Sequence, residues 1–104
     1  MWVFTRSSFL SLIADPNDPA MLTVRARMRG DIQRLWPDAT VMTTPLRDYR
    51  YRASIPREIV AAALTAEIVQ FTYGNFKASV SDPGRAHWYG WVWRTTSERC
   101  PERA

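Results

Sequence analysis

Two stretches of this chain place arginine at every second position. Residues 24–29 and 49–53 alternate arginine with apolar or aromatic residues. This period of two is typical of a half-buried strand, because successive side chains of a strand point to opposite faces. The predicted core-facing residues are Val24, Ala26, Met28, Tyr49, Tyr51 and Ala53. The predicted opposite face, which we call the arginine face, carries Arg25, Arg27, Arg29, Arg50 and Arg52.

An arginine face of this kind predicts an anionic partner. Guanidinium groups on one surface repel each other, and each forms planar, bidentate contacts with phosphate or carboxylate. We therefore expect a small binding or accessory protein that contacts either a nucleic acid or an acidic protein surface. Two other interpretations stay open. The arginines are solvated or paired with Asp31, Asp48 or Glu58, or they form a homodimer contact.

The composition fits one domain of ordinary globular type. The chain has 104 residues, of which 46% are hydrophobic and 23% are charged. Its fourteen basic residues outnumber the ten acidic ones, and all but Lys77 are arginines. A GC-rich genome, whose codons favour arginine, also accounts for this choice. Residues 1–52 hold eight arginines and five acidic residues, so the first half is the more basic.

Cysteine content and hydropathy indicate a cytoplasmic protein. Cys100 is alone, so no internal disulfide is expected. The longest apolar run, residues 59–64, is too short to span a membrane. One histidine and one cysteine do not make a zinc site of the usual kind, and no cofactor is indicated.

Hydrophobic periodicity predicts an α+β fold, with an antiparallel sheet of four to five strands and helices packed on one face. Strands are expected at residues 2–5, 9–14, 22–28, 39–44 and 49–55. Helices are expected at 31–36, 56–71 and 84–97, with a turn or short helix at 76–80. We expect residues 1–97 to form a single domain and residues 98–104 to be a frayed tail.

Several motifs together resemble a family of short, uncharacterised bacterial proteins. They are WVFT at 2–5, DYRYR at 48–52, YGNFK at 73–77, and Arg85, Tyr89 and Trp93 near the C-terminus. The family has no assigned activity, so the resemblance implies a stand-alone bacterial domain. Its members carry a histidine directly after the arginine that corresponds to Arg85, whereas this chain has Ala86 there. One residue turns a helical side chain by about 100°, which weakens a catalytic role for His87.

The alternative function is a metal-free enzyme with a pocket near His87, Tyr89 and Asn75. Asn75 and Lys77 are also secondary binding candidates, because they lie in an unusual loop. The structural interpretation of that loop is a helix break, with Gly74 or Asn75 in a left-handed conformation.

The aromatic residues are predicted to be structural. Tyr49 and Tyr51 alternate with arginine, so they should point away from the cations, and this argues against a base-stacking sheet. Trp88, Trp91 and Trp93 do not share one helix face. We expect Trp93 to be buried against Leu64 and Ile68.

Overall fold

The computed structural model describes residues 1–102. The chain divides into two units, Met1–Thr72 and Tyr73–Ala104. We call them the N-terminal and C-terminal units. Among the described residues, no helix has both the length and the apolar character needed to cross a membrane.

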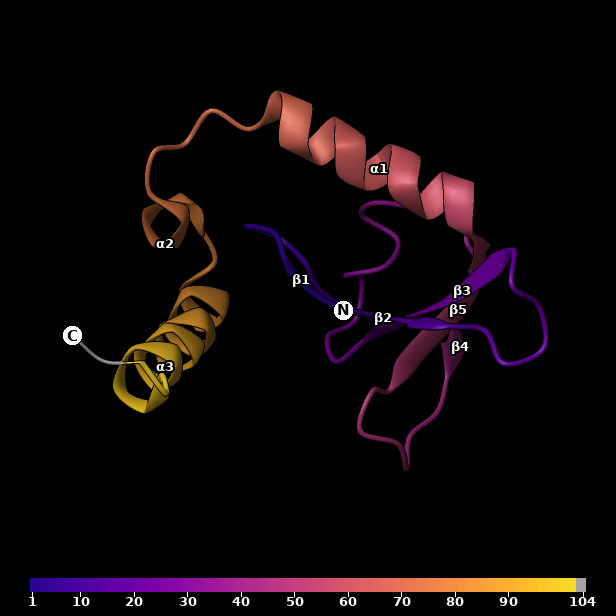
Figure 1. Cartoon of the computed structure of the whole chain (residues 1–104), viewed down its shortest axis with the longest axis horizontal. Coiled ribbons are helices and arrows are strands. Elements are labelled where there is room, and N and C mark those ends of the chain that lie inside the picture. The colour runs from indigo at the N-terminus through magenta and orange to yellow at the C-terminus, as the bar shows by residue number, and fades with distance from the viewer. Residues whose placement is uncertain (103–104) are drawn as a thin grey trace. The chain divides into compact units, whose positions relative to one another are not determined.

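The N-terminal unit is built on a five-stranded antiparallel sheet, which confirms the predicted α+β class. Its strands are β1 (Trp2–Phe4), β2 (Phe9–Ala14), β3 (Met21–Ala26), β4 (Met42–Thr43) and β5 (Tyr51–Pro56). They lie in the order β1-β2-β3-β5-β4 (Figure 1). The strand expected at 39–44 is reduced to two residues, because a turn joins Ala39 to Trp36 and Pro45 follows closely.

One face of this sheet carries the core. Helix α1 (Arg57–Gln70) begins directly after β5 and lies over the sheet (Figure 1). Val60 of α1 packs with Val24, Ala26 and other side chains of β2, β3 and β5. Ile32 and Trp36, from the segment between β3 and β4, complete this cluster. Burial of these apolar side chains provides most of the driving force that holds α1 to the sheet.

Helix α1 is less buried than its pattern predicts. Apolar residues recur at spacings of three and four along 56–71, which is typical of a core-facing helix, yet Ile59, Ile68 and Phe71 are all exposed, with Ile68 at 68%. The contact between α1 and the sheet is narrow, and this explains why these side chains are exposed. Val60 is the one fully buried residue of α1, and Ala63 and Leu64 are partly buried beside it.

The segment after β3 is a series of turns, and the predicted helix at 31–36 is absent. Strand β3 ends at Ala26, so Met28 is exposed and does not face the core as expected. Gly30 follows with φ 91°, a left-handed conformation that glycine adopts without a side-chain clash. Asp31 does not cap a helix: its Oδ2 accepts a hydrogen bond from the Phe9 backbone N–H at 2.9 Å.

The C-terminal unit contains α2 (Phe76–Ser79) and α3 (Pro83–Arg99). The side chains of Asn75 and Asp82 cap them, because each accepts a hydrogen bond from a backbone N–H three residues later. The Tyr89 ring stacks on Phe76 at 5.8 Å and its hydroxyl accepts a hydrogen bond from Arg85 at 3.0 Å. Helix α3 continues two residues past the expected end at residue 97.

The prediction that Trp93 is buried is wrong. Its side chain is 53% exposed. Instead, Nζ of Lys77 lies 3.6 Å from the centroid of the Trp93 ring. The apolar area of a tryptophan favours burial, but a cation over the exposed ring stabilises this arrangement too.

Candidate anion-binding face

The strand register places a row of residues across the face of the sheet that lies opposite α1. Residues paired directly on neighbouring strands share a face. Successive pairings give the cross-sheet row Trp2, Ser11, Arg25, Arg52 and Met42. The core residues of β3 and β5 alternate with this row, so the row lies on the arginine face.

Exposure sorts the residues of β3 and β5 as the alternation predicts. Val24, Ala26 and Tyr51 are buried, whereas Arg25 and Arg52 are only partly buried. Arg27 and Arg50, which lie just outside the two strands, are exposed. The predicted separation from the core is therefore confirmed for Arg25 and Arg52, and Arg27 and Arg50 are exposed as expected.

Arg25 is the centre of the row. Its Nη2 donates a hydrogen bond to Ser11 Oγ at 2.6 Å. Its Nε is buried and has no hydrogen-bond acceptor among the described residues. Across the strand pair lies Arg52, a second cation. Like charges directly opposite each other in a sheet are destabilising, so this position favours an added anion.

Tyr49 lies on the arginine face, and its predicted position on the core face is wrong. The guanidinium carbons of Arg25 and Arg27 lie 4.5 and 4.7 Å from the centroid of its ring. The alternation fails because β5 begins at Tyr51. The hydroxyl of Thr44 donates to the carbonyl oxygens of Tyr49 and Arg50, which holds the chain there in an irregular conformation.

Two ionisable groups of the site have shifted pKa values. Burial acts to raise the pKa of the Tyr49 phenol, but hydrogen bonds with Arg27, Ser11 and Trp2, and the charge of Arg27, outweigh it and lower the pKa. Burial lowers the pKa of Arg52, and the positive charges of Arg47 and Arg25 lower it further. Neighbouring arginines therefore contribute to both shifts, beside hydrogen bonding at Tyr49 and burial at Arg52.

No carboxylate of residues 1–102 forms an ion pair with an arginine of this region. The arginines concerned are Arg25, Arg27, Arg29, Arg47, Arg50 and Arg52. Asp31, one of the expected structural partners, instead pairs with Arg34 at 2.7 Å. The positive charge of the arginine face is therefore not neutralised within the described part of the chain.

Three of the five predicted arginines lie outside the row. Of these, within the described part of the chain, only Arg27 shares an aromatic contact, that with Tyr49, with an arginine of the row. The guanidinium carbon of Arg29 lies 5.6 Å from the centroid of the Tyr51 ring, and Tyr51 belongs to the core cluster. Arg29 therefore lies beside the opposite face, because the strand has ended before it. Arg50 is exposed just before β5, and its backbone carbonyl accepts hydrogen bonds from the backbone N–H and the hydroxyl of Thr44.

Sequence reasoning missed the aromatic residues that share the arginine face. The ring of Phe4 stacks on Phe9 at 4.4 Å, and Trp2 packs edge-on against Phe9 at 5.7 Å. Phe4 pairs with Phe9 across β1 and β2, two positions from the Trp2–Ser11 pair, and so lies on the same face. The alternation of Trp2 with Phe4 was the signal that could have found them. The expected separation of aromatic residues from the arginines therefore holds for Tyr51, which is in the core, and fails for Tyr49.

The structure gives the secondary candidates separate roles. Asn75 caps α2 through its side chain and has φ −132°, so the expected left-handed conformation is absent there. Within the part of the chain that is described, Gly30 alone has a positive φ. The ammonium group of Lys77 lies over the Trp93 ring, whereas the Asn75 side chain accepts the capping hydrogen bond from Ala78.

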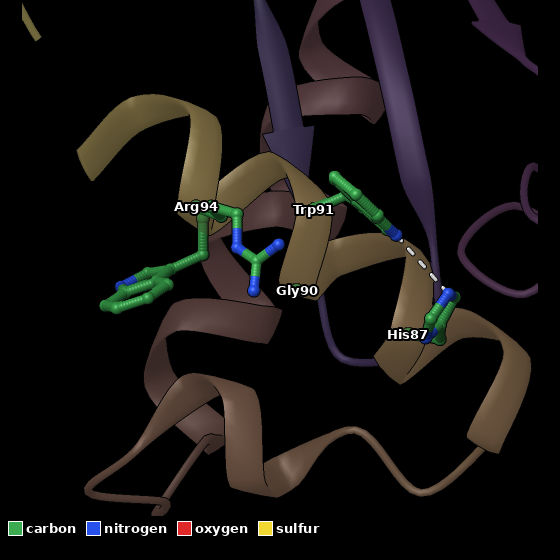
Figure 2. Close-up of a pocket in the computed structure, with 5 residues that line it drawn as sticks. His87, Gly90, Trp91 and Arg94 are labelled. Atoms are coloured by element: carbon green, nitrogen blue, oxygen red, sulfur yellow. Dashed lines mark hydrogen bonds between the residues drawn. The ribbon is translucent and has the colours of Figure 1, made fainter. Parts of the chain in front are cut away.

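The residues of the alternative enzyme site have different neighbours. His87 lines a groove on α3 with Gly90, Trp91, Trp93 and Arg94 (Figure 2). Tyr89 and Asn75 do not line this groove. His87 Nε2 accepts a hydrogen bond from the indole N–H of Trp91 at 3.3 Å. This groove therefore does not combine His87 with Tyr89 and Asn75.

Comparison of the chain with protein-family models, curated proteins and solved structures found no match. Within residues 1–102, no three His, Cys, Asp or Glu side chains are grouped so that they could hold a metal ion.

Proposed function

We propose that the protein binds single-stranded nucleic acid through the arginine face. Arg25, Arg27 and Arg52 contact phosphate groups, and Trp2 stacks on a base. This assignment makes the protein a binding or accessory protein, and it uses side chains from β1, β3 and β5.

The observation that carries the proposal is the facing pair of Arg25 and Arg52. The two cations lie opposite each other with no carboxylate partner in the described chain, and the buried Nε of Arg25 lacks an acceptor. A phosphate placed between the partly exposed guanidinium groups of Arg25 and Arg52 would reduce the repulsion between the two charges. Hydrogen bonds between arginine and phosphate are charge-assisted and therefore stronger than neutral ones.

Trp2 favours nucleic acid over an acidic protein surface. Its side chain is 63% exposed and it occupies the same cross-sheet row as Arg25. Stacking of a base on an aromatic ring contributes about 1–3 kcal/mol and tolerates any sequence. An acidic protein patch would engage the arginines without needing this indole.

Binding of a labelled oligothymidylate at low salt, followed by fluorescence anisotropy, tests the proposal. Replacing Arg25 and Arg52 together with glutamine should weaken binding by about tenfold or more. The matched control is the double variant Arg6→Gln/Arg99→Gln, which removes the same charge from two exposed arginines outside the row. A similar loss in both double variants would contradict a specific role for the row.

A second comparison separates stacking from charge. Heparin is a polyanion without bases, so Trp2→Ala should weaken oligothymidylate binding while retention on heparin stays unchanged. If the protein is retained on heparin and Trp2→Ala leaves oligothymidylate binding unchanged, the face recognises negative charge without base stacking. That result would instead favour the acidic-partner interpretation. A protein that binds neither ligand at low salt would overturn the proposal.

A further inference from the structure

Helix α3 leaves a stretch of its backbone uncovered at Gly90. A Cβ built on this residue would meet no atom within 4 Å, so the space above it is open. Glycine inside a helix costs about 1 kcal/mol relative to alanine. Helix stability therefore does not explain a glycine at position 90. What the glycine provides is open space beside the helix backbone.

Large aromatic side chains border this space. Trp91 and Trp93 are 56% and 53% exposed, although tryptophan normally buries much of its area. With His87, Gly90 and Arg94 they line a groove of about 470 Å³, and its lining is mostly apolar. Figure 2 shows the Trp91 and His87 side chains turned toward each other, joined by their hydrogen bond.

The rim of the groove is positively charged. The guanidinium carbon of Arg94 lies 5.2 Å from the centroid of the Trp91 ring, and Lys77 lies over Trp93. The carboxylate of Glu98 approaches Arg94 only to 3.9 Å, and both side chains are exposed. Such a pair contributes little, so Arg94 keeps most of its capacity to attract an anion.

We propose that this groove binds a planar aromatic ring that carries a negative charge, such as the base and phosphate of a nucleotide. The ring lies over the backbone at Gly90 against the indoles, and the anionic group meets Arg94 or Lys77. An apolar cleft with a few charged groups at its rim is typical of a small-ligand site. The groove lies within the C-terminal unit, so this proposal is independent of the arginine face.

Three small probes test the proposal on the full chain. Adenosine 5′-monophosphate has both ring and charge, adenosine lacks the charge, and ribose 5-phosphate lacks the ring. We expect the monophosphate to shift the indole N–H signals of Trp91 and Trp93 in NMR spectra, assigned with the single Trp→Phe variants. Adenosine and ribose 5-phosphate should each bind about tenfold more weakly. Equal binding of adenosine and the monophosphate would overturn the role of charge.

Gly90→Leu gives the decisive variant, because its side chain fills the groove. Leucine favours helix more than glycine does, so helix content should be retained while binding of the monophosphate is lost. Gly90→Ala, which meets no neighbouring atom, is the milder form and should weaken binding. Gly84→Ala, in the first turn of the same helix, should leave binding unchanged.

The arginine-face variant separates the two proposals. Arg25→Gln/Arg52→Gln should bind the monophosphate as the unaltered protein does, even if it no longer binds oligothymidylate. Absence of any shift at the two indoles, or the same shift in Gly90→Leu, would overturn the groove proposal and leave the proposed function unaffected.

Discussion

Arg25 is held in place by its neighbours without being neutralised by them. Ser11 fixes one end of the guanidinium, and the Tyr49 ring packs against it. A buried donor without an acceptor costs about 1–3 kcal/mol, so the folded protein is less stable than it would be with Nε satisfied. Since the side chain is already ordered, a bound anion would not have to order it. Preorganisation of this kind raises affinity.

The surroundings of Tyr49 predict that its phenol ionises at a lower pH than an ordinary tyrosine. The chain has four tyrosines, and the lowered pKa of Tyr49 means that its ionised form is favoured in the folded state. Ultraviolet difference spectra at high pH should show that ionisation at this site begins below the usual value of about 10. Comparison with Tyr49→Phe identifies the transition.

The same shift has a consequence for stability. Because the pKa of Tyr49 is lower in the folded than in the unfolded state, its ionised form contributes to the free energy of unfolding. This contribution is fully present above the unfolded-state pKa and is lost as the pH falls through the folded-state pKa. Arg27→Gln should return the transition toward the ordinary value. A Tyr49 that ionises at or above that value in the unaltered protein would contradict the described contacts.

At the scale of elements, the alternating pattern predicted the strands but not where they begin and end. Strand β2 has the bounds that the sequence predicts, and the faces of Val24 and Arg25 are correct. Tyr49 was misplaced because the hydrogen bonds of Thr44 decide where β5 begins, and these come from another segment. Alternation of apolar and polar residues predicts which side chains of a strand share a face, but it does not predict the residues at which the strand begins and ends.

The segment at 31–36 shows the same limit for helices. An aspartate before an apolar run is typical of a helix cap. Here the side chain of Asp31 is fully buried and accepts from the Phe9 N–H, while Arg34 Nη1 donates to it at 2.7 Å. Contacts with β2 therefore take the place of the local capping bond.

Asp31 should consequently matter more for stability than its surface partner. Asp31→Ala removes acceptors for a buried backbone N–H and for a guanidinium, which should cost about 2–3 kcal/mol in urea unfolding. Arg34→Ala removes the half-exposed partner and should cost less than about 1 kcal/mol. Equal losses in the two variants would show that the carboxylate does not link this segment to β2.

At the scale of the whole molecule, charge placement matters more than net charge. The net charge of +4 is modest for a chain of 104 residues. On the arginine face, however, strand pairing brings Arg25 and Arg52 together, and Arg27 contacts the same tyrosine as Arg25. The sequence alone predicted these arginines as a set. The register and the shared aromatic residues required the structure, because they depend on contacts between distant segments.

The salt dependence of oligothymidylate binding tests this account most directly. Each phosphate neutralised on a single strand contributes about −0.7 to the slope of the logarithm of the binding constant against the logarithm of salt concentration. Arg25→Gln/Arg52→Gln should therefore flatten the slope by about 1.4, while Arg6→Gln/Arg99→Gln leaves it unchanged. The same slope in all three proteins would contradict the claim that Arg25 and Arg52 form the anion-binding site.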